Sequence, residues 1–592
     1  QTEIGLYLGR RYGAGAILYD DVSLVEDDSV RVGDLSPAPN PRLAPTAAEA
    51  RRGYLVSSQH WMELVYPTYQ PVRAEVVNGL RCRLARGEYE PVTLSLTALR
   101  PLRNARVTVV SDLRGPGGAR QPASAVQVGV VRSITRWLNN SEPLKAGQSY
   151  ERRPLFIFPG DVADIAAGET QRYWLTVHAP PDARPGVYRT RLRVSADGAP
   201  ATTLPLTAEV LPLRLPEPDV TYGMYYRQCC QYPEFRTEEF FRRSMMDMRA
   251  HGCNSVSVYA NVERRLPDGT FEPDFDLEGP GHGIGEEHMA LNRQMALLRE
   301  AGLLQEGHPL LFLACGRSNG IFANEERLVQ AVEARRRAEG WPELLYYLVD
   351  EPAADQRELI HGLADVVHRV PGVRTTTAIG EPGELGQYYD VWILSDSVDP
   401  MERTVAQARA AGKEAWTYNC NWNGCQPRND RYFTGYFTWT AGLTGNWQWC
   451  YTEATGGRVT DDGSLDFGDV TYYEDPHRYS YVLPTPTGNV PTLGWEGRRE
   501  GIDDYRYLQA VRDAAEVAAR SPDPERRALA REAQSFLRAV RRLTRRPQQH
   551  LPATQTARIY EHLVHPGLAP ADYDTIRARA AAYVVGLQAS DR

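Results

Sequence analysis

The sequence predicts a multidomain protein, in which an N-terminal β-sandwich is followed by a (β/α)8 TIM barrel and C-terminal helices. The chain has 592 residues, which is too long for one hydrophobic core. Residues 56–216 contain short runs in which apolar and polar residues alternate, as in half-buried strands. After residue 218, apolar strand-like runs alternate with helical patterns eight times, and this order is typical of a barrel.

The composition excludes several classes of function. A hydrophobic content of 42% and a charged content of 24% are typical of globular proteins. A net charge of −8 without a basic stripe argues against a nucleic-acid or anionic-membrane partner. No stretch approaches the roughly 20 apolar residues of a membrane span. The 8 cysteines lack metal-ligand spacing and no phosphate loop is present, so we expect no metal and no cofactor. No feature indicates an oligomeric state.

The first 55 residues are predicted to precede the sandwich. Residues 1–30 contain two strand-like runs, and the second, at 16–26, resembles the closing strand of jelly-roll carbohydrate-binding modules of secreted glycosidases. We interpret 1–30 as the tail of such a module, or as two edge strands of the next domain. Residues 31–55 are rich in Pro, Ala and Arg and predict a linker. The chain starts at Gln1 without a visible signal peptide, so we expect a processed or truncated form of a secreted, periplasmic or cell-surface protein.

The β-sandwich is assigned to residues 56–216. Runs at 92–96, 106–110 and 173–177 alternate apolar and polar residues, and turns rich in Pro and Gly, such as 180–182 and 185–186, separate the strands.

The barrel is assigned to residues 218–520. Helical patterns occur between its strands, for example at 238–250, 286–301 and 325–338, and the helix after the eighth strand is expected at 498–520, after an insertion near 451–490. A C-terminal segment, 521–592, has helical patterns near 524–545 and 571–588 and is expected to pack outside the barrel. The predicted barrel strands lie near 220–226, 254–259, 309–315, 344–350, 373–379, 390–395, 414–419 and 444–450.

Two adjacent carboxylates, Asp350 and Glu351, follow the fourth predicted strand and precede Pro352, which cannot continue a β-ladder. Barrel enzymes carry their chemistry at the carboxyl ends of the strands. Where the strand ends and the chain turns, both side chains can reach one cavity. The alternative is that these acids only cap the following helix.

The other strand ends supply a rim of aromatic, amide and carboxylate side chains. Aromatic faces stack on sugar rings, and carboxylates and amides bind hydroxyl groups. One or two of the four tryptophans are expected to be core residues. The candidate substrate-binding residues are Tyr225, Tyr259, Asn261, Trp392, Asp396, Tyr418, Asn419, Trp439, Trp447 and Trp449.

The acids that are present favour one mechanism of glycoside hydrolysis. A direct retaining glycosidase requires a second carboxylate about 5–5.5 Å from the acid. The only acid of the seventh strand, Glu414, lies at the wrong end of that strand. An adjacent Asp-Glu pair suits a mechanism in which the substrate's own 2-acetamido group attacks the anomeric carbon. Glu351 would then be the general acid and base, and Asp350 would orient the acetamido nitrogen.

Several motifs resemble glycoside hydrolase family 123 and its uncharacterised relatives, over about residues 80–520. They are Ala-Arg-Gly-Glu-Tyr-Glu-Pro at 85–91, Pro-Gly-Val-Tyr at 185–188, Val-Asp-Glu-Pro at 349–352 and the stretch from Trp495 to Tyr505. The resemblance implies a retaining exo-β-N-acetylgalactosaminidase that uses substrate assistance, with Asp350 and Glu351 in the roles given above.

Two other functions remain open. One is a glycosidase for a sugar without the acetamido group, in which a distant acid such as Asp396 is the nucleophile or base. The other is a non-catalytic carbohydrate-binding protein.

The acids and arginine of the stretch after the eighth strand, Glu496, Arg499 and Asp504, are expected to order the last loop rather than to contact substrate.

Overall fold

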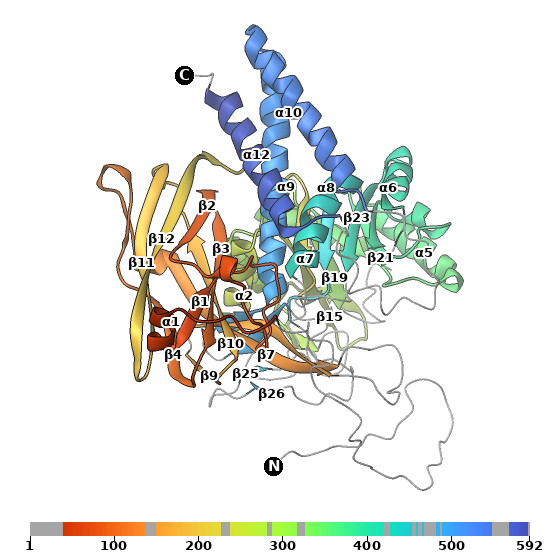
Figure 1. The fold of residues 1–592 in the computed structure, drawn as a ribbon. Coiled ribbons are helices and arrows are strands. Elements are labelled where there is room, and N and C mark those ends of the chain that lie inside the picture. Colours follow the sequence, from red (N-terminus) through yellow and green to blue (C-terminus); the bar gives the residue numbers. More distant parts are fainter. Residues whose placement is uncertain are drawn as a thin grey trace.

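The computed structural model describes residues 40–137, 150–160, 162–226, 237–280, 287–315, 326–396, 398, 400–419, 427–452, 458–459, 465–466, 481–485, 488–546 and 567–589. The module tail predicted at residues 1–30 lies outside the described residues. Figure 1 shows two β-rich regions side by side, with three helices, α9, α10 and α12, projecting beyond them.

The N-terminal region consists of two sheets that share one hydrophobic core, to which residues such as Leu94 and Leu192 contribute from opposite sheets. The first sheet has the order β1 (Tyr54–Ser57), β3 (Tyr89–Ala98), β10 (Thr170–His178), β7 (Val126–Trp137) and β8 (Tyr150–Pro159). The second has the order β2 (Leu80–Arg86), β12 (Ala199–Arg214), β11 (Gly186–Ala196), β4 (Leu102–Val109) and β9 (Ala163–Ile165), with β5 (Leu113–Arg114) and β6 (Arg120–Gln121) at its side.

Part of the predicted linker is regular structure. Helix α1 (Ala47–Arg52) begins after Thr46, whose hydroxyl accepts a hydrogen bond from the Glu49 amide while the Glu49 carboxylate accepts one from the Thr46 amide. Strand β1 follows at Tyr54. The linker prediction is therefore wrong for residues 47–55, because this reciprocal capping box starts a helix that the Pro- and Ala-rich composition concealed.

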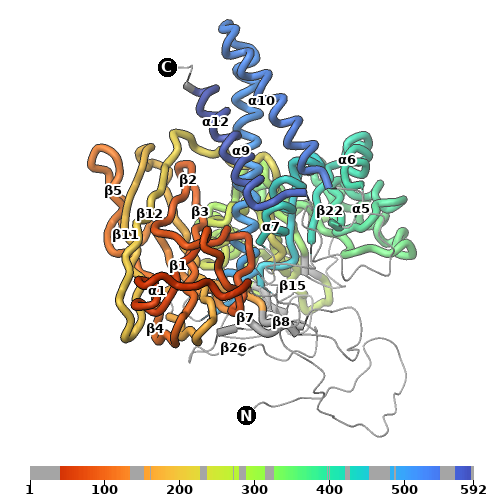
Figure 2. Tube along the Cα trace, in the orientation of Figure 1, coloured from red at the N-terminus to blue at the C-terminus, as the bar shows by residue number. Residues whose placement is uncertain are grey.

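The second region is a closed barrel of eight parallel strands, as predicted, and the strands lie near the expected positions. The tube in Figure 2 separates this green-to-cyan part of the chain from the red-to-yellow sheets. The strands are β13 (Thr221–Met224), β14 (Ser255–Asn261), β19 (Leu310–Cys315), β20 (Leu344–Tyr347), β21 (Arg374–Ile379), β22 (Val391–Ser395), β23 (Glu414–Asn419) and β24 (Gly445–Gln448).

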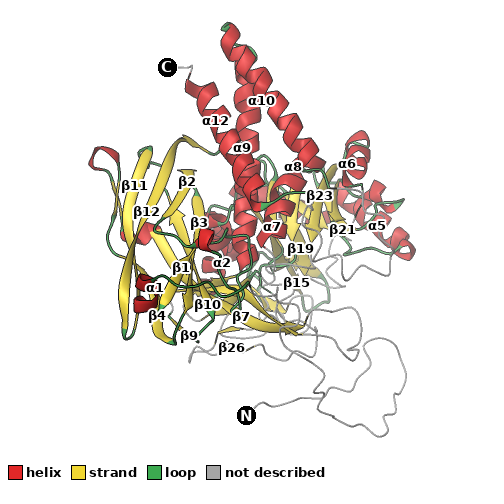
Figure 3. Ribbon diagram, viewed as in Figure 1, coloured by secondary structure: helices red, strands yellow, loops and turns green. Residues whose placement is uncertain are grey.

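The helices cover the barrel and extend beyond it (Figure 3). The predicted helix at 286–301 begins later, because residues 287–288 pair with 279–280 as short strands. The helices around the barrel are α2 (Glu238–Ala250), α3 (Leu291–Ala301), α4 (Glu326–Glu339), α5 (Arg357–His368), α6 (Met401–Ala410), α7 (Pro427–Tyr432) and α8 (Thr438–Ala441), with a π-helical turn at Phe433–Phe437. The C-terminal helices are α9 (Leu493–Ala518), α10 (Pro524–Leu543) and α12 (Pro570–Ala589).

Short strands form additional two-stranded pairs in the loops. They are β15 (Glu263–Arg265) with β16 (Phe271–Pro273), β17 (Gly279–Pro280) with β18 (Glu287–His288), β25 (Arg458–Val459) with β26 (Leu465–Asp466), and β27 (Val482–Thr485) with β28 (Gly488–Pro491). The last two pairs lie in the predicted insertion near 451–490.

Two stacked tryptophans fill the inside of the barrel. The rings of Trp416 and Trp447 are parallel within 7°, with centroids 5.8 Å apart, and both are fully buried. A Cβ atom on Gly445 would lie 2.3 Å from Trp416, and one on Gly223 would lie 2.3 Å from Trp447. Both glycines are therefore required by close approach, and the barrel interior is a packed core rather than a pore.

A buried ion-pair network joins the sheets to the helices. The guanidinium of Arg577, in α12, donates to Asp504 at 2.8 Å, to Glu500 at 2.7 Å and to Glu90 at 3.1 Å. Its contact with Glu88 is 3.4 Å. Burial raises the pKa of Glu88 to about 8, with a further contribution from neighbouring acids, although Arg577 opposes this. One cation thus holds together carboxylates from the sheet region and from α9.

We predict that Arg577→Met destabilises the protein by about 3–5 kcal/mol, because it leaves several buried carboxylates without their shared cation. Urea unfolding at neutral pH measures this loss. The matched control is Arg579→Met, on the same helix, which removes only an exposed contact with the Phe536 ring and should cost less than about 1 kcal/mol. Equal effects of the two substitutions would contradict the role given to Arg577.

Candidate active site

The carboxylate pair lies where β20 gives way to an irregular turn. The strand ends at Tyr347, three residues before the predicted end, and Asp350 and Glu351 are both exposed. Glu351 has a φ of 41°, in the left-handed region that non-glycine residues seldom adopt. Because the chain has left regular strand geometry here, the two adjacent side chains are not forced to opposite faces.

Tyr347 holds Asp350. Its hydroxyl donates to Oδ1 of Asp350 at 2.5 Å and accepts a hydrogen bond from the Ala378 amide at 2.9 Å. Burial raises the pKa of Tyr347 well above its usual value, and Tyr225 and Asp350 raise it further. The phenol therefore remains protonated, and its two hydrogen bonds fix the direction in which it donates.

Tyr418 holds Glu351 in the same way, from another strand. Its hydroxyl donates to Oε1 of Glu351 at 2.5 Å. The ring of Tyr225 lies between the two anchoring tyrosines, with its centroid 6.3 Å from that of Tyr347 and 6.3 Å from that of Tyr418. Three tyrosines from β20, β23 and the end of β13 thus bring both carboxylates to one place at the carboxyl ends of the strands.

Trp449 adds an aromatic wall beside this tyrosine cluster. Its ring centroid lies 5.5 Å from that of Tyr225, and the side chain is only partly buried. Tyr259 and Asn261 are also partly buried, at the end of β14. Their strand neighbours Val258 and Ala260 pack against the helices, so strand alternation places Tyr259 and Asn261 on the inner face.

Trp447 lies beneath the site rather than on its surface. It is fully buried, and its ring centroid is 5.5 Å from that of Tyr225. It packs beneath the tyrosine cluster, and its buried ring cannot stack on a sugar. The prediction that Trp447 contacts the substrate is therefore wrong, and its role is packing.

Trp392 is placed on the outside of the barrel. Its indole nitrogen donates to the carbonyl of Gly386 at 2.8 Å, and the ring belongs to the core between strands and helices. Its neighbours Val391 and Ile393 occupy the inner face instead. The prediction of a substrate contact is therefore wrong. Side chains alternate between the two faces of β22, and Trp392 lies on the outer face because Val391 and Ile393 lie on the inner one.

Trp439 is also wrongly predicted as a site residue. It lies in α8, before β24, and its ring contacts Tyr505 of α9 at a centroid distance of 5.4 Å. The start of β24 belongs to the amino-terminal end of the barrel, whereas the carboxylate pair lies at the other end.

Asp396 and Asn419 are buried, with 3% and 1% of their surface exposed. Asn419 is adjacent to the inward-facing Tyr418 on β23, so its side chain points to the opposite face. The carbonyl of Asp396 accepts a hydrogen bond from Arg546. Such burial gives a substrate no access to either side chain, and we do not retain them as substrate contacts.

Glu414 is located at the amino-terminal end of β23, as the sequence indicated. It pairs with Arg374 at 2.5 Å, and Arg374 also binds Glu343 through two contacts. Burial opposes ionisation of Glu414, but Arg374 outweighs it and lowers the pKa of this carboxyl. Glu414 therefore has a structural role and is not a second catalytic acid.

Glu496 and Arg499, which follow the eighth strand, lie in a buried polar cluster, and their ordering of the last loop stays a prediction. Glu496 pairs with Arg499 and lies 3.3 Å from Nε2 of His251. On its other side His251 contacts Asp247, which accepts hydrogen bonds from Tyr451 and Trp495. This buried cluster ties α2 to α9 and to the residues that follow β24.

Asp504 likewise has a structural role. It receives two hydrogen bonds from the guanidinium of Arg431, at 2.7 and 3.0 Å.

In the parts of the chain that the structure describes, no group of three or more His, Cys, Asp or Glu side chains could hold a metal ion. Among the same residues, no helix is long and apolar enough to cross a membrane.

The fold is similar to that of a family 123 glycoside hydrolase from Clostridium perfringens, described in a study of glycolipid glycan hydrolysis. The TM-score is 0.63 at 14% identity, over 90% of this chain and 97% of that one. This likeness confirms the resemblance to family 123 at the level of the fold. No protein-family model and no curated protein matches the sequence.

Two further solved structures are much less similar. A family 39 glycoside hydrolase from Bacteroides cellulosilyticus has a TM-score of 0.34 at 12% identity, over 64% of this chain and 76% of that one. A family 5 xyloglucanase from Bacteroides ovatus has a TM-score of 0.28 at 10% identity, over 72% of this chain and 98% of that one. These scores are too low to support an argument.

Tyr347 is the site residue that the sequence analysis did not identify. It lies within the strand predicted near 344–350, just before the carboxylate pair. Alternation along β20 could have found it, since a residue near the strand end on the inner face is a candidate for the barrel mouth.

We predict a pH dependence of stability that comes from His251. Burial lowers its pKa, but Asp247 and Glu496 outweigh burial and raise it from 6.5 to about 9. The stabilisation by protonated His251 is therefore fully present below pH 6.5 and is lost as the pH rises through 9. Between pH 6.5 and pH 9 the free energy of unfolding of the wild type should fall by as much as about 3 kcal/mol more than that of His251→Gln.

Urea unfolding at pH 6 and at pH 9.5 tests this difference. The matched control is His361→Gln, which removes an exposed histidine of α5 that contacts the exposed Asp365 and the Tyr388 ring and should leave the wild-type pH dependence unchanged. Parallel stability curves for the wild type and His251→Gln would show that the buried imidazole is not charged at neutral pH.

Proposed function

We propose that this protein is a retaining exo-glycosidase that releases terminal β-linked N-acetylgalactosamine by substrate-assisted catalysis. One observation carries the proposal: two adjacent, exposed carboxylates are each held by a different tyrosine at the carboxyl end of a (β/α)8 barrel. The similarity of the fold to a family 123 enzyme supports the same class of reaction.

In the first step, Glu351 is the general acid. Its carboxyl proton goes to the glycosidic oxygen as the bond from that oxygen to the anomeric carbon breaks, and the acetamido oxygen of the same sugar forms a new bond to that carbon. Tyr418 holds Oε1 of Glu351. It thereby fixes the orientation of the carboxyl group, a large part of what an active site contributes to rate.

Asp350 stabilises the intermediate. The oxazolinium ring carries a positive charge next to the acetamido nitrogen, and an ionised carboxylate that accepts the N–H hydrogen bond balances this charge. Tyr347 holds Oδ1 of Asp350, so the carboxylate is oriented before the substrate binds.

In the second step, Glu351 acts as the base. It removes a proton from a water molecule, which attacks the anomeric carbon and opens the oxazolinium ring. The sugar is released with its original anomeric configuration, because two successive displacements invert the carbon twice. Glu351 regains its proton and is ready for another cycle.

The substrate-binding residues that we retain are Tyr259, Asn261, Tyr418 and Trp449, whereas Tyr225 is 3% exposed and is corrected to a packing role between the two anchoring tyrosines. Aromatic rings such as Trp449 provide stacking surfaces, and Asn261 provides an amide that can bind a hydroxyl group. We further propose that residues 218–520 form the catalytic domain, that residues 56–216 and 521–592 support it, and that the protein acts outside the cytoplasm on glycans or glycoconjugates.

The alternative glycosidase, acting on a sugar without an acetamido group, would need a second accessible carboxylate. Its candidate, Asp396, is 3% exposed, and this burial disfavours a nucleophile at that position. The non-catalytic alternative is disfavoured by the paired and oriented carboxylates, since a binding protein has no need for an acid with a fixed direction.

We predict that Glu351→Gln lowers turnover of substrates with poor leaving groups by about 10²–10⁴-fold, because general acid assistance is lost. Activated p-nitrophenyl substrates should be less affected in the first step. The matched control is Glu358→Gln, an exposed glutamate at the start of α5, which should retain full activity. Wild-type activity of Glu351→Gln on a natural glycan would show that another residue is the acid.

We also predict that a thiazoline derived from N-acetylgalactosamine is a tight inhibitor, because it mimics the cyclic intermediate. Asp350→Asn should weaken this inhibition by roughly 10- to 100-fold, since a hydrogen bond to a charged group contributes about 1.5–3 kcal/mol. p-Nitrophenyl glycosides with a 2-hydroxyl group should be nearly inert. Full activity on a 2-hydroxyl galactoside together with indifference to the thiazoline would instead favour an enzyme-borne nucleophile.

A further inference from the structure

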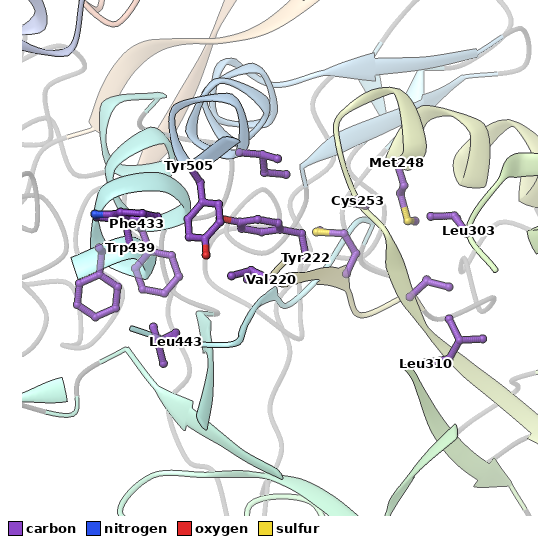
Figure 4. Close-up of a cluster of buried hydrophobic side chains, with 14 of the residues drawn as sticks. Val220, Tyr222, Met248, Cys253, Leu303, Leu310, Phe433, Trp439, Leu443 and Tyr505 are labelled. Carbon is purple, nitrogen blue, oxygen red and sulfur yellow. The ribbon is translucent and has the colours of Figure 1, made fainter. Parts of the chain in front are cut away.

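A second cavity, of about 430 Å³, lies at the end of the barrel opposite the carboxylate pair. It is bordered by the residues before β13, by the turn from α8 into β24, and by α9 and α10. Figure 4 shows the side chains at its inner end, where Trp439, Leu443 and Tyr505 lie close to Val220. This volume is within the range of small-molecule binding sites.

The polar lining of this cavity has an excess of positive charge. Arg512, Arg538 and Arg541 line it, and the only carboxylate among the lining residues is Asp219. Arg409 reaches the rim from α6, where it donates to the carbonyl of Gly442 at 3.5 Å. We call Arg512, Arg538 and Arg541 together the arginine cluster.

Only one member of the arginine cluster is neutralised. Arg512 pairs with Asp219 and with the adjacent Asp513, each at 2.8 Å. Within the described parts of the chain, Arg538 and Arg541 form no ion pair. Arg538 donates to the hydroxyl of Ser535 and Arg541 to the carbonyl of Trp439. Among the residues that the structure describes, these two guanidinium groups therefore line the cavity without a carboxylate partner.

The indole of Trp439 keeps part of the arginine cluster in position. The guanidinium carbons of Arg512 and Arg541 lie 5.9 and 5.7 Å from its ring centroid, within the range of cation–π attraction. Two like charges thus lie near one ring, although the Arg541 side chain is still exposed to solvent. Guanidinium groups held in this way are suited to binding the oxygens of a phosphate or sulfate group in pairs.

Another arginine-containing cavity in the same chain provides a contrast. It has a volume of about 330 Å³ and lies between the sheets and α12. Its buried cation, Arg577, is shared by Glu88, Glu90, Glu500 and Asp504. Arg81 and Arg83 also line that cavity, together with Glu90 and Asp574. The charge of Arg577 itself is met by carboxylates of the protein, whereas Arg538 and Arg541 form no ion pair within the described residues.

We propose that the arginine cluster and Trp439 form a second binding site, which takes the phosphate or sulfate ester of a small polar molecule such as a sugar. The ester oxygens accept hydrogen bonds from Arg538 and Arg541, and the remainder of the molecule lies in the cavity beside Trp439 and Leu443. The site is separate from the carboxylate pair and does not depend on the proposed hydrolysis.

Titration calorimetry at constant ionic strength tests the proposal on the full chain. The probes are glucose 6-phosphate, glucose 6-sulfate, glucose, sodium phosphate and sodium sulfate. We expect saturable binding of at least one ester, weaker binding of the free ions and no binding of glucose. The double substitution Arg538→Gln, Arg541→Gln should weaken ester binding about tenfold or more.

Two variants serve as controls. Arg542→Gln changes an exposed arginine next to the cluster that does not line the cavity, and it should bind the esters as the wild type does. Glu351→Gln should also bind them normally, which separates this site from the carboxylate pair. Thermal melting confirms that the variants are folded.

The absence of saturable ester binding, or an equal loss in Arg542→Gln and the double variant, would overturn the second site. Binding of free phosphate or sulfate as tight as that of the esters would identify an adventitious ion only and would overturn the assignment of an ester.

Discussion

Closure of the barrel is the constraint on which the site depends, and a fully buried arginine spans the closing seam. Arg498, from α9, donates to the carbonyls of Gly223 and Asn446 at 3.0 and 3.2 Å, and to the Asn446 side chain at 2.9 Å. Gly223 is in β13 and Asn446 is in β24, the first and last strands. A buried cation is costly unless it is well hydrogen-bonded, so Arg498 strongly favours the arrangement in which these two strands are adjacent.

Once the barrel is closed, the positions of the strand ends follow, and with them the positions of the tyrosines. Tyr225, Tyr347 and Tyr418 come from strands that are far apart in sequence and meet only because the barrel is continuous. Trp447 supports them from below. The carboxylates themselves lie in an irregular turn, and their direction is set by phenol groups on rigid strands. Sites held by rigid elements are more precise than sites held by loops alone.

The sequence was sufficient to predict the eight barrel strands. Several are apolar runs, such as Leu310–Cys315 and Val391–Ser395, and the more polar ones, such as Arg374–Ile379, follow from the regular alternation with helical patterns. It was also sufficient to locate Asp350 and Glu351, since the proline after the pair ends the strand and leaves both acids at its carboxyl end. It did not separate the inner from the outer face of each strand. Trp392 is therefore predicted on the wrong side, and Tyr347 is not identified as a site residue.

Long-range pairing is a second limit on prediction from sequence. Arg577 contacts Glu88 across 489 positions, and no local pattern indicates such a partner. The capping box at Thr46 is different, because its spacing is visible in the sequence and a closer reading of the predicted linker would have found it. Trp439 lies near the eighth strand in sequence but at the opposite end of the barrel, so proximity along the chain was misleading there.

We propose that Glu351 and the substrate's own acetamido group act in two displacements, with Asp350 stabilising the intermediate. The stereochemical course of hydrolysis tests this claim most directly. Proton NMR of the first product formed from p-nitrophenyl N-acetyl-β-galactosaminide distinguishes the two anomers before they interconvert. Two displacements release the β-anomer of N-acetylgalactosamine first. Initial release of the α-anomer would show a single displacement by water and would contradict the proposal.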